Sequence, residues 1–500
     1  MDKKKSILNV SVSLITKIIT MVMVVVVKRY LIQICGNEVN GLNALYLSII
    51  GVLTVAELGV GSAITFCMYK PIVEGDSQKV AALYGLFQKI YMLVGVFILI
   101  AGLMLTPFIH FFAADYAQLN VNLYITFVLM LISIVLTYFY GAKSALINAH
   151  KNNYITTAIT SGGTLLQYVL QIVVLLLTRS FVAYLICRIV AAVVQWLLTE
   201  IVARRKYNPI LRDWQKVDKS TKKELTKSVK AMFMHQIGYV LVNTVDSVII
   251  SFFVGVVALG EYSNYATIMT SMTAVLKMIF SSLTSVLGHL FVEKTRETSK
   301  KYCEAFHLLN FAVGTVFFLG YYAVIDSLVA ILFDEGLIVA KAVSLAITVN
   351  GFVQFMRSGV LAFRDATGTF YYDRWKPLVE GIVNIVLSIV FVKLVGVAGV
   401  IVATIITNLL ICHVVEPYVL YKHAFKTTPK WYYLRNYTMM AAFGVALLIM
   451  DNAMQPFANH WTTFFVNGCI SVGISAVICA IVLAGSRDLR ELILQKLKRR

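Results

Sequence analysis

Hydrophobic residues occur along the chain in long runs that are separated by short polar segments. A run of about 20 such residues is long enough to cross a bilayer as a helix. The runs begin near Ile7, Leu42, Gln88, Val121, Tyr154, Phe181, Ala231, Tyr262, Ala305, Lys341, Pro377, Val397, Tyr432 and Thr462. This pattern predicts an all-α, polytopic membrane protein with about 14 transmembrane helices.

The composition supports a membrane protein and explains the strongly basic charge. Of the 500 residues, 59% are hydrophobic and 14% are charged, an apolar excess that a soluble core does not absorb. The net charge is +19, and most Lys and Arg residues lie in loops on one side of the predicted membrane. By the positive-inside rule that side is the cytoplasm, with both termini in it. The basic loops therefore face anionic lipid headgroups, and no nucleic-acid partner is expected.

A basic segment divides the chain unequally. Residues 204–230 hold ten Lys and Arg between the sixth and seventh spans. The predicted organisation is an N-terminal lobe at 1–203, a cytoplasmic linker at 204–230, a C-terminal lobe at 231–420, and two further helices with a basic cytoplasmic tail at 421–500.

A short glycine pattern recurs in the two predicted lobes. Gly36 and Gly41 lie between spans one and two, and Gly255 and Gly260 lie between spans seven and eight. Internal repeats of this kind are common in transporters. We expect two pseudo-symmetric six-helix lobes around a central cavity.

The first span contains cations that are expensive to bury. Lys17 lies near its middle, and a lysine at the bilayer centre costs about 2.5–3.5 kcal/mol, so it usually faces a cavity or a partner. Lys28 is eleven residues further, close to the same helix face. We expect this stripe to attract an anion. For Lys28 and Arg29, reaching out to the outer membrane interface is an equal alternative.

Charged and polar residues recur in spans two, seven and eight. Glu57 and Asp246 either bind protons or sodium ions that couple transport to a gradient, or pair with Lys277 and Lys28. The candidates for coupling or gating are Glu57, Asp246, His235 and Asn243, and Lys277 is a further candidate for substrate binding.

Two arginines lie in other apolar spans. Arg357 shares a helix face with Asn350 and Gln354, which suggests either cavity lining or an internal pair between helices. Arg188 has no obvious polar stripe beside it and is expected to be structural.

The loop after the second span carries helix signals. We expect Pro71 to end one helix and Asp76 or Ser77 to cap the next. An apolar face then follows, as in a helix that lies at the membrane interface; it consists of Val80, Leu83, Tyr84 and Phe87.

Signatures of catalysis are missing from the sequence. It contains no phosphate-binding GxxxxGK[ST], no HExxH, no GxSxG and no paired cysteine motif. The loops on the outer side are short. The sequence thus favours transport over catalysis, and it predicts no metal or other cofactor apart from coupling H⁺ or Na⁺.

Several stretches resemble a known family. They are Gly36-x4-Gly41-Leu42, Glu57 to Ala63, Tyr69-Lys-Pro71 with Asp76, Ser263-Asn-Tyr265, and Arg364 to Gly368 followed by Pro377, Glu380, Asn384, Ser388, Gly396 to Gly399 and Thr404. Together they resemble the polysaccharide-type (Wzx-like) flippases of the MATE-like MOP superfamily, from about residue 5 to about residue 420.

The resemblance implies a flippase in the cell membrane that works by alternating access. Its expected substrate is an oligosaccharide repeat unit on undecaprenyl pyrophosphate, and its expected partners are membrane lipids, a polysaccharide polymerase and chain-length machinery. By position, the cavity cations would be Lys17, Lys28, Lys277 and Arg357. A peptidoglycan-precursor flippase, a multidrug or cation antiporter and a membrane-embedded polymerase are the alternatives.

Overall fold

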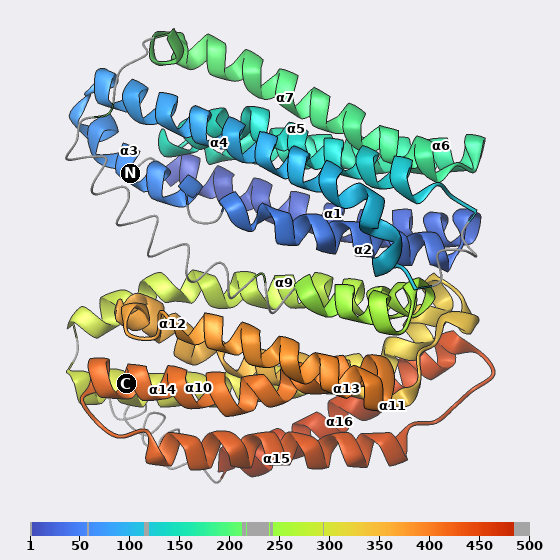
Figure 1. Cartoon of the computed structure of the whole chain (residues 1–500). Helices are drawn as coiled ribbons and strands as arrows, with labels where there is room; N and C mark the ends of the chain where they lie inside the picture. The colour runs from blue at the N-terminus through green and yellow to red at the C-terminus, as the bar shows by residue number, and fades with distance from the viewer. Residues whose placement is uncertain are drawn as a thin grey trace. The chain divides into compact units, whose positions relative to one another are not determined.

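The computed structural model describes residues 3–57, 60–114, 120–212, 217, 240, 244–293 and 295–484. These residues form helices and connecting loops, with no strand among them (Figure 1). The chain forms two compact units, Met1–Gly260 and Glu261–Arg500. The predicted all-α membrane fold is confirmed: ten helical stretches of the described residues are long and apolar enough to cross a membrane.

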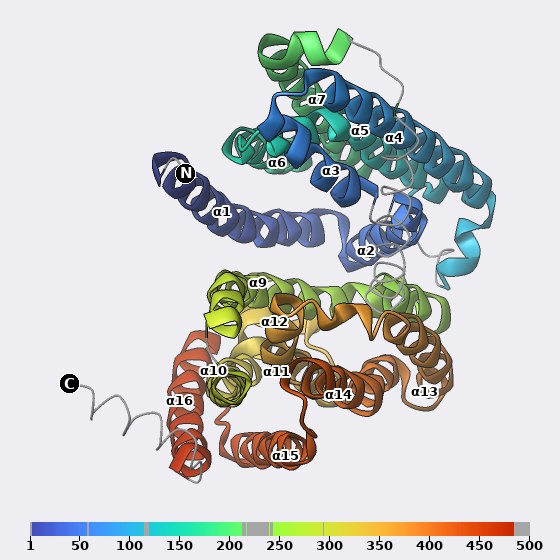
Figure 2. The same cartoon turned by 90° about the vertical axis from the view of Figure 1, so that its left-hand side faces the viewer.

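The described residues of the first unit form seven long helices and a shorter one. They are α1 (Lys3–Cys35), α2 (Asn37–Leu53), α3 (Val60–Glu74), α4 (Ser77–Leu105), α5 (Leu123–Ala149), α6 (Asn153–Thr178), α7 (Phe181–Arg212) and the apolar helix Thr244–Phe253. In this unit α5 packs against α4 and α7, while α6 packs against α7 and α1 (Figure 2). The predicted linker begins inside α7, and most of it lies outside the described residues.

The second predicted span is interrupted. The 3₁₀ segment η1 (Thr54–Glu57) follows α2, and α3 begins at Val60. Two predictions for the following loop are wrong, because α3 continues past Pro71 and no separate interfacial helix forms. The predicted interfacial face belongs to α4 and is buried in the core of the unit. Asp76 is confirmed as the cap of α4, where its side chain accepts a hydrogen bond from the Lys79 amide at 2.9 Å.

The repeated glycines have matching backbone roles. Gly36, just before α2, has φ +92°, and Gly255, the first glycine of the second pattern, has φ +125°. Backbone angles with positive φ favour glycine. A Cβ on Gly41 would lie 2.0 Å from the carbonyl oxygen of Val256, and one on Gly260 would lie 2.5 Å from a backbone oxygen of α2. The two glycine patterns therefore permit a close approach of α2 to the turn that follows Gly255.

The second unit contains the remaining helices. They are α9 (Val256–Glu293, which begins in the first unit), α10 (Arg296–Leu332), α11 (Lys341–Met356), α12 (Ser358–Ala366), α13 (Lys376–Thr407), the π-helical η6 (Asn408–Cys412), α14 (His413–Leu420), the π-helical η7 (Tyr421–Phe425), α15 (Lys430–Ala453) and α16 (His460–Ala484). A break at Val395 and Gly396, where Gly396 has φ +60°, separates the two spans predicted to begin near Pro377 and Val397.

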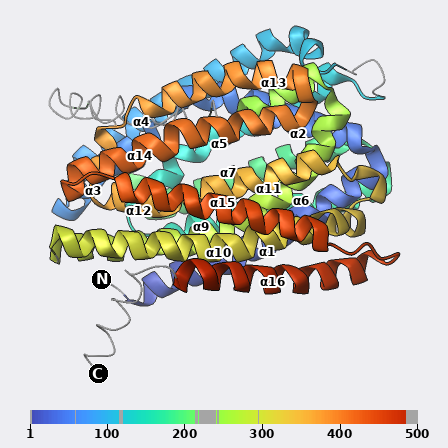
Figure 3. The same cartoon turned by 90° about the horizontal axis from the view of Figure 1, so that it is seen from below.

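The last two helices are integrated into the second unit. Both α10 and α15 pack along α16 (Figure 3). Asp451 of α15 forms an ion pair with Lys341 at 2.7 Å and accepts a hydrogen bond from the Tyr322 hydroxyl at 2.6 Å. These contacts attach α15 to the beginning of α11 and to α10. The basic tail predicted after α16 lies outside the described residues.

Candidate functional site: buried charges within the apolar helices

The predicted cations of α1 have different surroundings. Lys17 is exposed, as are the neighbouring Ile15 and Ile18. Lys28 is buried, with 9% of its surface exposed, and Arg29 is half-buried. Because Lys28 is buried, most of its side chain is enclosed by protein and does not extend to the surface. The anion-binding role of all three residues stays a prediction.

Glu57 is held by a hydrogen bond from a phenol. It lies at the end of η1, where the second span is interrupted. The hydroxyl of Tyr91 in α4 donates to its carboxylate, and the phenol of Tyr138 in α5 interacts with it electrostatically. A Cβ on Gly61 would lie 2.6 Å from the Tyr91 hydroxyl, and one on Gly141 would lie 2.5 Å from the Tyr91 ring. Glycine at these two positions thus makes room for the ring that reaches Glu57.

The other predicted coupling residues are only partly described. Asp246 is half-buried in the helix Thr244–Phe253. Lys277 belongs to α9, but its side chain lies outside the described part of the structure. His235 and Asn243 lie outside the described residues altogether.

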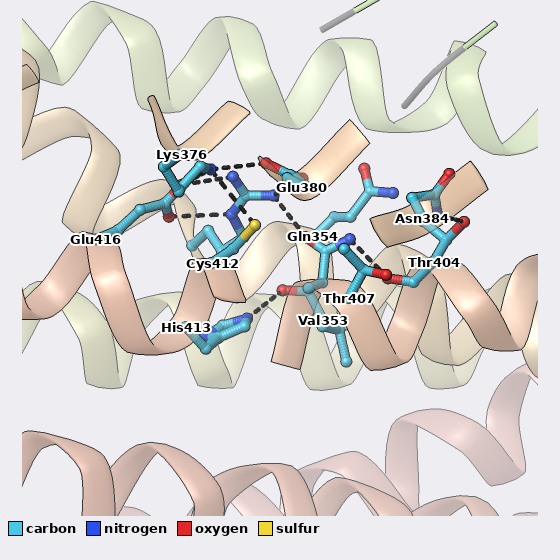
Figure 4. Close-up of polar contacts among 12 residues, drawn as sticks. Val353, Gln354, Lys376, Glu380, Asn384, Thr404, Thr407, Cys412, His413 and Glu416 are labelled. Atoms are coloured by element: carbon cyan, nitrogen blue, oxygen red, sulfur yellow. Dashed lines mark hydrogen bonds and ion pairs between the residues drawn. The ribbon is translucent and has the colours of Figure 1, made fainter. Parts of the chain in front are cut away.

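The second unit contains a cluster of four charged side chains, hereafter the charge cluster, formed by Arg357, Lys376, Glu380 and Glu416 (Figure 4). Arg357 connects α11 to α12, while Lys376 and Glu380 lie one turn apart at the start of α13. Glu416 lies in α14. Residues that are distant in sequence thus meet where the junction of α11 and α12, the start of α13 and α14 come together; α14 follows the π-helical η6.

Glu416 is the centre of the charge cluster. Its carboxylate accepts from Arg357 Nε at 3.0 Å and Nη2 at 2.5 Å, a two-pronged arrangement that guanidinium groups favour. The same carboxylate accepts from Lys376 Nζ at 2.6 Å. Glu416 is 1% exposed, so its charge is supported by these two cations rather than by water.

Glu380 completes the charge balance. Its carboxylate lies 2.8 Å from Lys376 Nζ and 3.7 Å from Arg357 Nη1. Arg357 also donates to the Asn408 side-chain oxygen at 2.5 Å. Two cations therefore face two carboxylates inside the second unit. These are the contacts of an internal pair between helices, and a role of Arg357 in substrate binding stays a prediction.

A polar stripe leads away from the charge cluster along both legs of the broken helix. Glu380, Asn384 and Ser388 follow one another at four-residue intervals, so they share a face of α13. Asn384 donates to the Thr404 hydroxyl at 2.9 Å across the break (Figure 4). All three residues that the family resemblance singles out here are buried. These residues of the resemblance motif thus form one polar stripe along α13.

Sequence reasoning missed two members of the charge cluster. The sequence around Lys376, with Arg364 and Arg374 close by, looks like a basic loop, but of these three residues only Arg374 is exposed. Glu416 follows an apolar run and was given no role. One signal was available: Lys376 and Glu380 are spaced as an ion pair on a helix, next to the proline at its beginning.

Comparison with solved structures shows which known fold the chain shares. The chain is similar to a structure titled "Lipid II flippase MurJ, inward closed conformation", at 14% identity, with a TM-score of 0.66 over 97% of this chain and 100% of that one. It is also similar to an inward-facing multidrug resistance MATE transporter of the MOP superfamily, at 14% identity, with a TM-score of 0.57 over 88% and 98% of the two chains. The fold is that of MOP transporters.

Sequence comparison then identifies the family. Residues 3–287 match the family described as "Polysaccharide biosynthesis protein". The chain belongs to this family. No curated protein sequence matches it. The predicted relation to polysaccharide-synthesis proteins is thereby confirmed, and transport and its substrate are matters for proposal.

Proposed function

We propose that the protein is a flippase that moves oligosaccharide repeat units, linked to undecaprenyl pyrophosphate, across the cytoplasmic membrane for cell-surface polysaccharide synthesis. The family membership carries this proposal. It is supported by basic residues inside apolar spans, among them the buried Lys28. Both termini are proposed to lie in the cytoplasm.

The physical task explains the need for such a protein. A lipid pyrophosphate cannot cross about 30 Å of hydrocarbon unaided, because an isolated buried charge is very costly. Cationic side chains replace water around the phosphates while the lipid tail stays in the bilayer. Rocking of one half of the transporter against the other then opens the path alternately to each side. Lys17, Lys28, Arg29 and Lys277 are the proposed cationic contacts.

Coupling to an ion gradient is a second part of the proposal. Glu57 lies at an interrupted helix and accepts a hydrogen bond from the Tyr91 phenol, a setting in which gaining a proton or a sodium ion changes local hydrogen bonding. We propose Glu57 and Asp246 as the coupling residues for H⁺ or Na⁺. Glu57→Gln should remove the dependence of export on the gradient. If that dependence is unchanged in Glu57→Gln, Glu57 is not the coupling residue.

Deletion of the gene tests the proposed substrate. The lipid-linked oligosaccharide should accumulate on the cytoplasmic side, and surface polysaccharide should disappear, together with the supply to a polymerase and chain-length machinery. Accumulation of the peptidoglycan precursor instead would identify the alternative flippase. Unchanged lipid and unchanged surface polysaccharide would refute both.

Substitution of Lys17 tests the proposed path. Lys17→Ala should abolish export while the amount of protein in the membrane stays normal, because the substitution removes a cation and no described ion pair. Lys79→Ala is a matched control, since Lys79 is an exposed lysine in the first turn of α4. Normal export by Lys17→Ala would remove Lys17 from the mechanism.

A further inference from the structure

The interface between α6 and α7 is polar along most of its length. Gln171 donates to the Tyr184 carbonyl at 3.3 Å, and Gln195 donates to the Thr160 carbonyl at 3.4 Å. Gln195 also accepts from the Tyr140 hydroxyl at 2.7 Å. These bonds pair the later part of α6 with the start of α7 and the middle of α6 with the middle of α7. We refer to this interface as the polar seam.

Arg188 lies in the polar seam, between the levels of Tyr184 and Gln195. The exposed residues Ile186 and Val190 are each two positions away, which is about 200° around the helix, so they lie on the opposite face of α7. Tyr184 and Gln195 on the seam side are buried. Arg188 therefore points toward the interior of the first unit.

The charge of Arg188 is not balanced by a carboxylate in the part of the chain that the structure describes. Its Nε is buried without a hydrogen-bond partner. The groups that interact with it electrostatically are the phenols of Tyr168 and Tyr184, which are neutral. Arg188 is half-buried, so part of the side chain stays accessible. This is a cation with unused hydrogen-bond donors among neutral polar groups.

Such an arrangement is expensive unless it has a ligand. An arginine near the middle of a membrane helix is costly to insert, and such residues commonly mark substrate paths. The planar guanidinium group matches the two oxygens of a phosphate or carboxylate. In the same polar seam, the Gln167 amide donates to the Gln171 side-chain oxygen at 3.4 Å.

We propose that Arg188 binds an oxyanion of the transported molecule, either a phosphate of the lipid carrier or a carboxylate of an acidic sugar. The proposal rests on the proposed function and adds to it a binding residue in the first unit. The phenols of Tyr168 and Tyr184 interact electrostatically with the guanidinium, and the ligand supplies the negative charge that the described residues do not supply there.

Binding of inorganic pyrophosphate to the full chain in detergent tests the site directly. Pyrophosphate should raise the thermal midpoint of the wild-type protein, and Arg188→Gln should weaken this binding at least tenfold. Arg204→Gln is the matched control: Arg204 lies on the same helix and pairs with Glu200 at the surface, so pyrophosphate binding should be retained. Equal pyrophosphate binding by Arg188→Gln and the wild type would overturn a phosphate site.

A second ligand distinguishes the source of the oxyanion. Glucuronate should stabilise the wild type, but not Arg188→Gln, if a sugar carboxylate is the bound group. Arg188→Lys keeps the charge but loses the planar fork, so its affinity for the bound oxyanion should be intermediate. A loss of both ligands' effects without loss of the unliganded fold supports the site. If neither ligand's effect depends on Arg188, the inference is wrong.

Export in cells separates this inference from the proposed function. In a deletion strain, the wild-type gene and Arg204→Gln should restore surface polysaccharide, and Arg188→Gln should restore less than a tenth of it at equal protein levels. Full restoration by Arg188→Gln overturns the inference while the proposed function stands. If the wild-type gene itself does not affect lipid-linked oligosaccharide, the proposed function fails, and the pyrophosphate measurement still decides the anion site.

Discussion

Two interior regions handle buried cations in opposite ways. In the charge cluster, Arg357 and Lys376 are balanced by Glu380 and Glu416 at 2.5–3.7 Å. In the polar seam, the groups that interact electrostatically with Arg188 are the phenols of Tyr168 and Tyr184. A balanced cluster fixes helices to one another, and its loss should affect folding first. A cation among neutral groups keeps positive charge for a ligand, and its loss should affect transport first.

The sharpest test of this difference is Glu416→Gln. The substitution leaves two cations without their shared carboxylate, and removal of one partner from a buried pair costs about 3–5 kcal/mol. We expect a corresponding loss of unfolding free energy, measured by denaturant titration in mixed micelles. A stability equal to that of the wild type would show that the charge cluster does not stabilise the second unit.

Glu380→Gln should have a smaller effect on the same quantity. Lys376 keeps its 2.6 Å contact with Glu416, and Arg357 keeps its two-pronged contact with the same carboxylate. The loss is then about 1–3 kcal/mol, as for one unsatisfied buried hydrogen-bonding group. A loss larger than that of Glu416→Gln would reverse the ranking and identify Glu380 as the centre of the charge cluster.

The pair Lys376→Met and Glu416→Gln should be non-additive, because the two side chains are in direct contact. The double variant should be more stable than Glu416→Gln alone, since it no longer buries two cations beside the single carboxylate of Glu380. Each protein is compared by the same denaturant titration. Strictly additive losses would mean that Lys376 and Glu416 do not depend on each other.

Arg188→Gln should have the smallest effect on stability of the four. No described carboxylate loses its partner, so the change in unfolding free energy should be about 1 kcal/mol or less. Arg204→Gln, which opens a surface pair, should give a similarly small change of about 0–1 kcal/mol. A loss of several kcal/mol in Arg188→Gln, with export unchanged, would make Arg188 a structural residue like those of the charge cluster.

The sequence predicts the helices well because the membrane imposes a length and a polarity on them. The start of α11 at Lys341 and the break near Gly396 follow from apolar runs and glycine alone. The interruption at Glu57 does not, because the run through it stays apolar and only packing reveals the break. The face from Val80 to Phe87 was misread because an apolar stripe does not say whether it contacts lipid or protein.

The buried charges are harder to predict because their partners are far apart in sequence. Arg357 and Lys376 contact Glu416 because the chain turns back at the break in α13, which brings α14 next to the start of α13. The charge of Lys376 looks like a loop charge until its burial is known. The sequence suggests a structural role for Arg188 because no polar stripe accompanies it on its own helix, and half of the polar seam comes from another helix.

Transport in a purified system tests the proposed function most directly. The protein is reconstituted into vesicles with a fluorescent undecaprenyl-pyrophosphate oligosaccharide on the inner leaflet, and a membrane-impermeant quencher is added outside. The account predicts that the protected label becomes accessible in vesicles with the wild-type protein and far more slowly in vesicles with Arg188→Gln. A label that stays protected in wild-type vesicles, across imposed proton and sodium gradients, would contradict it.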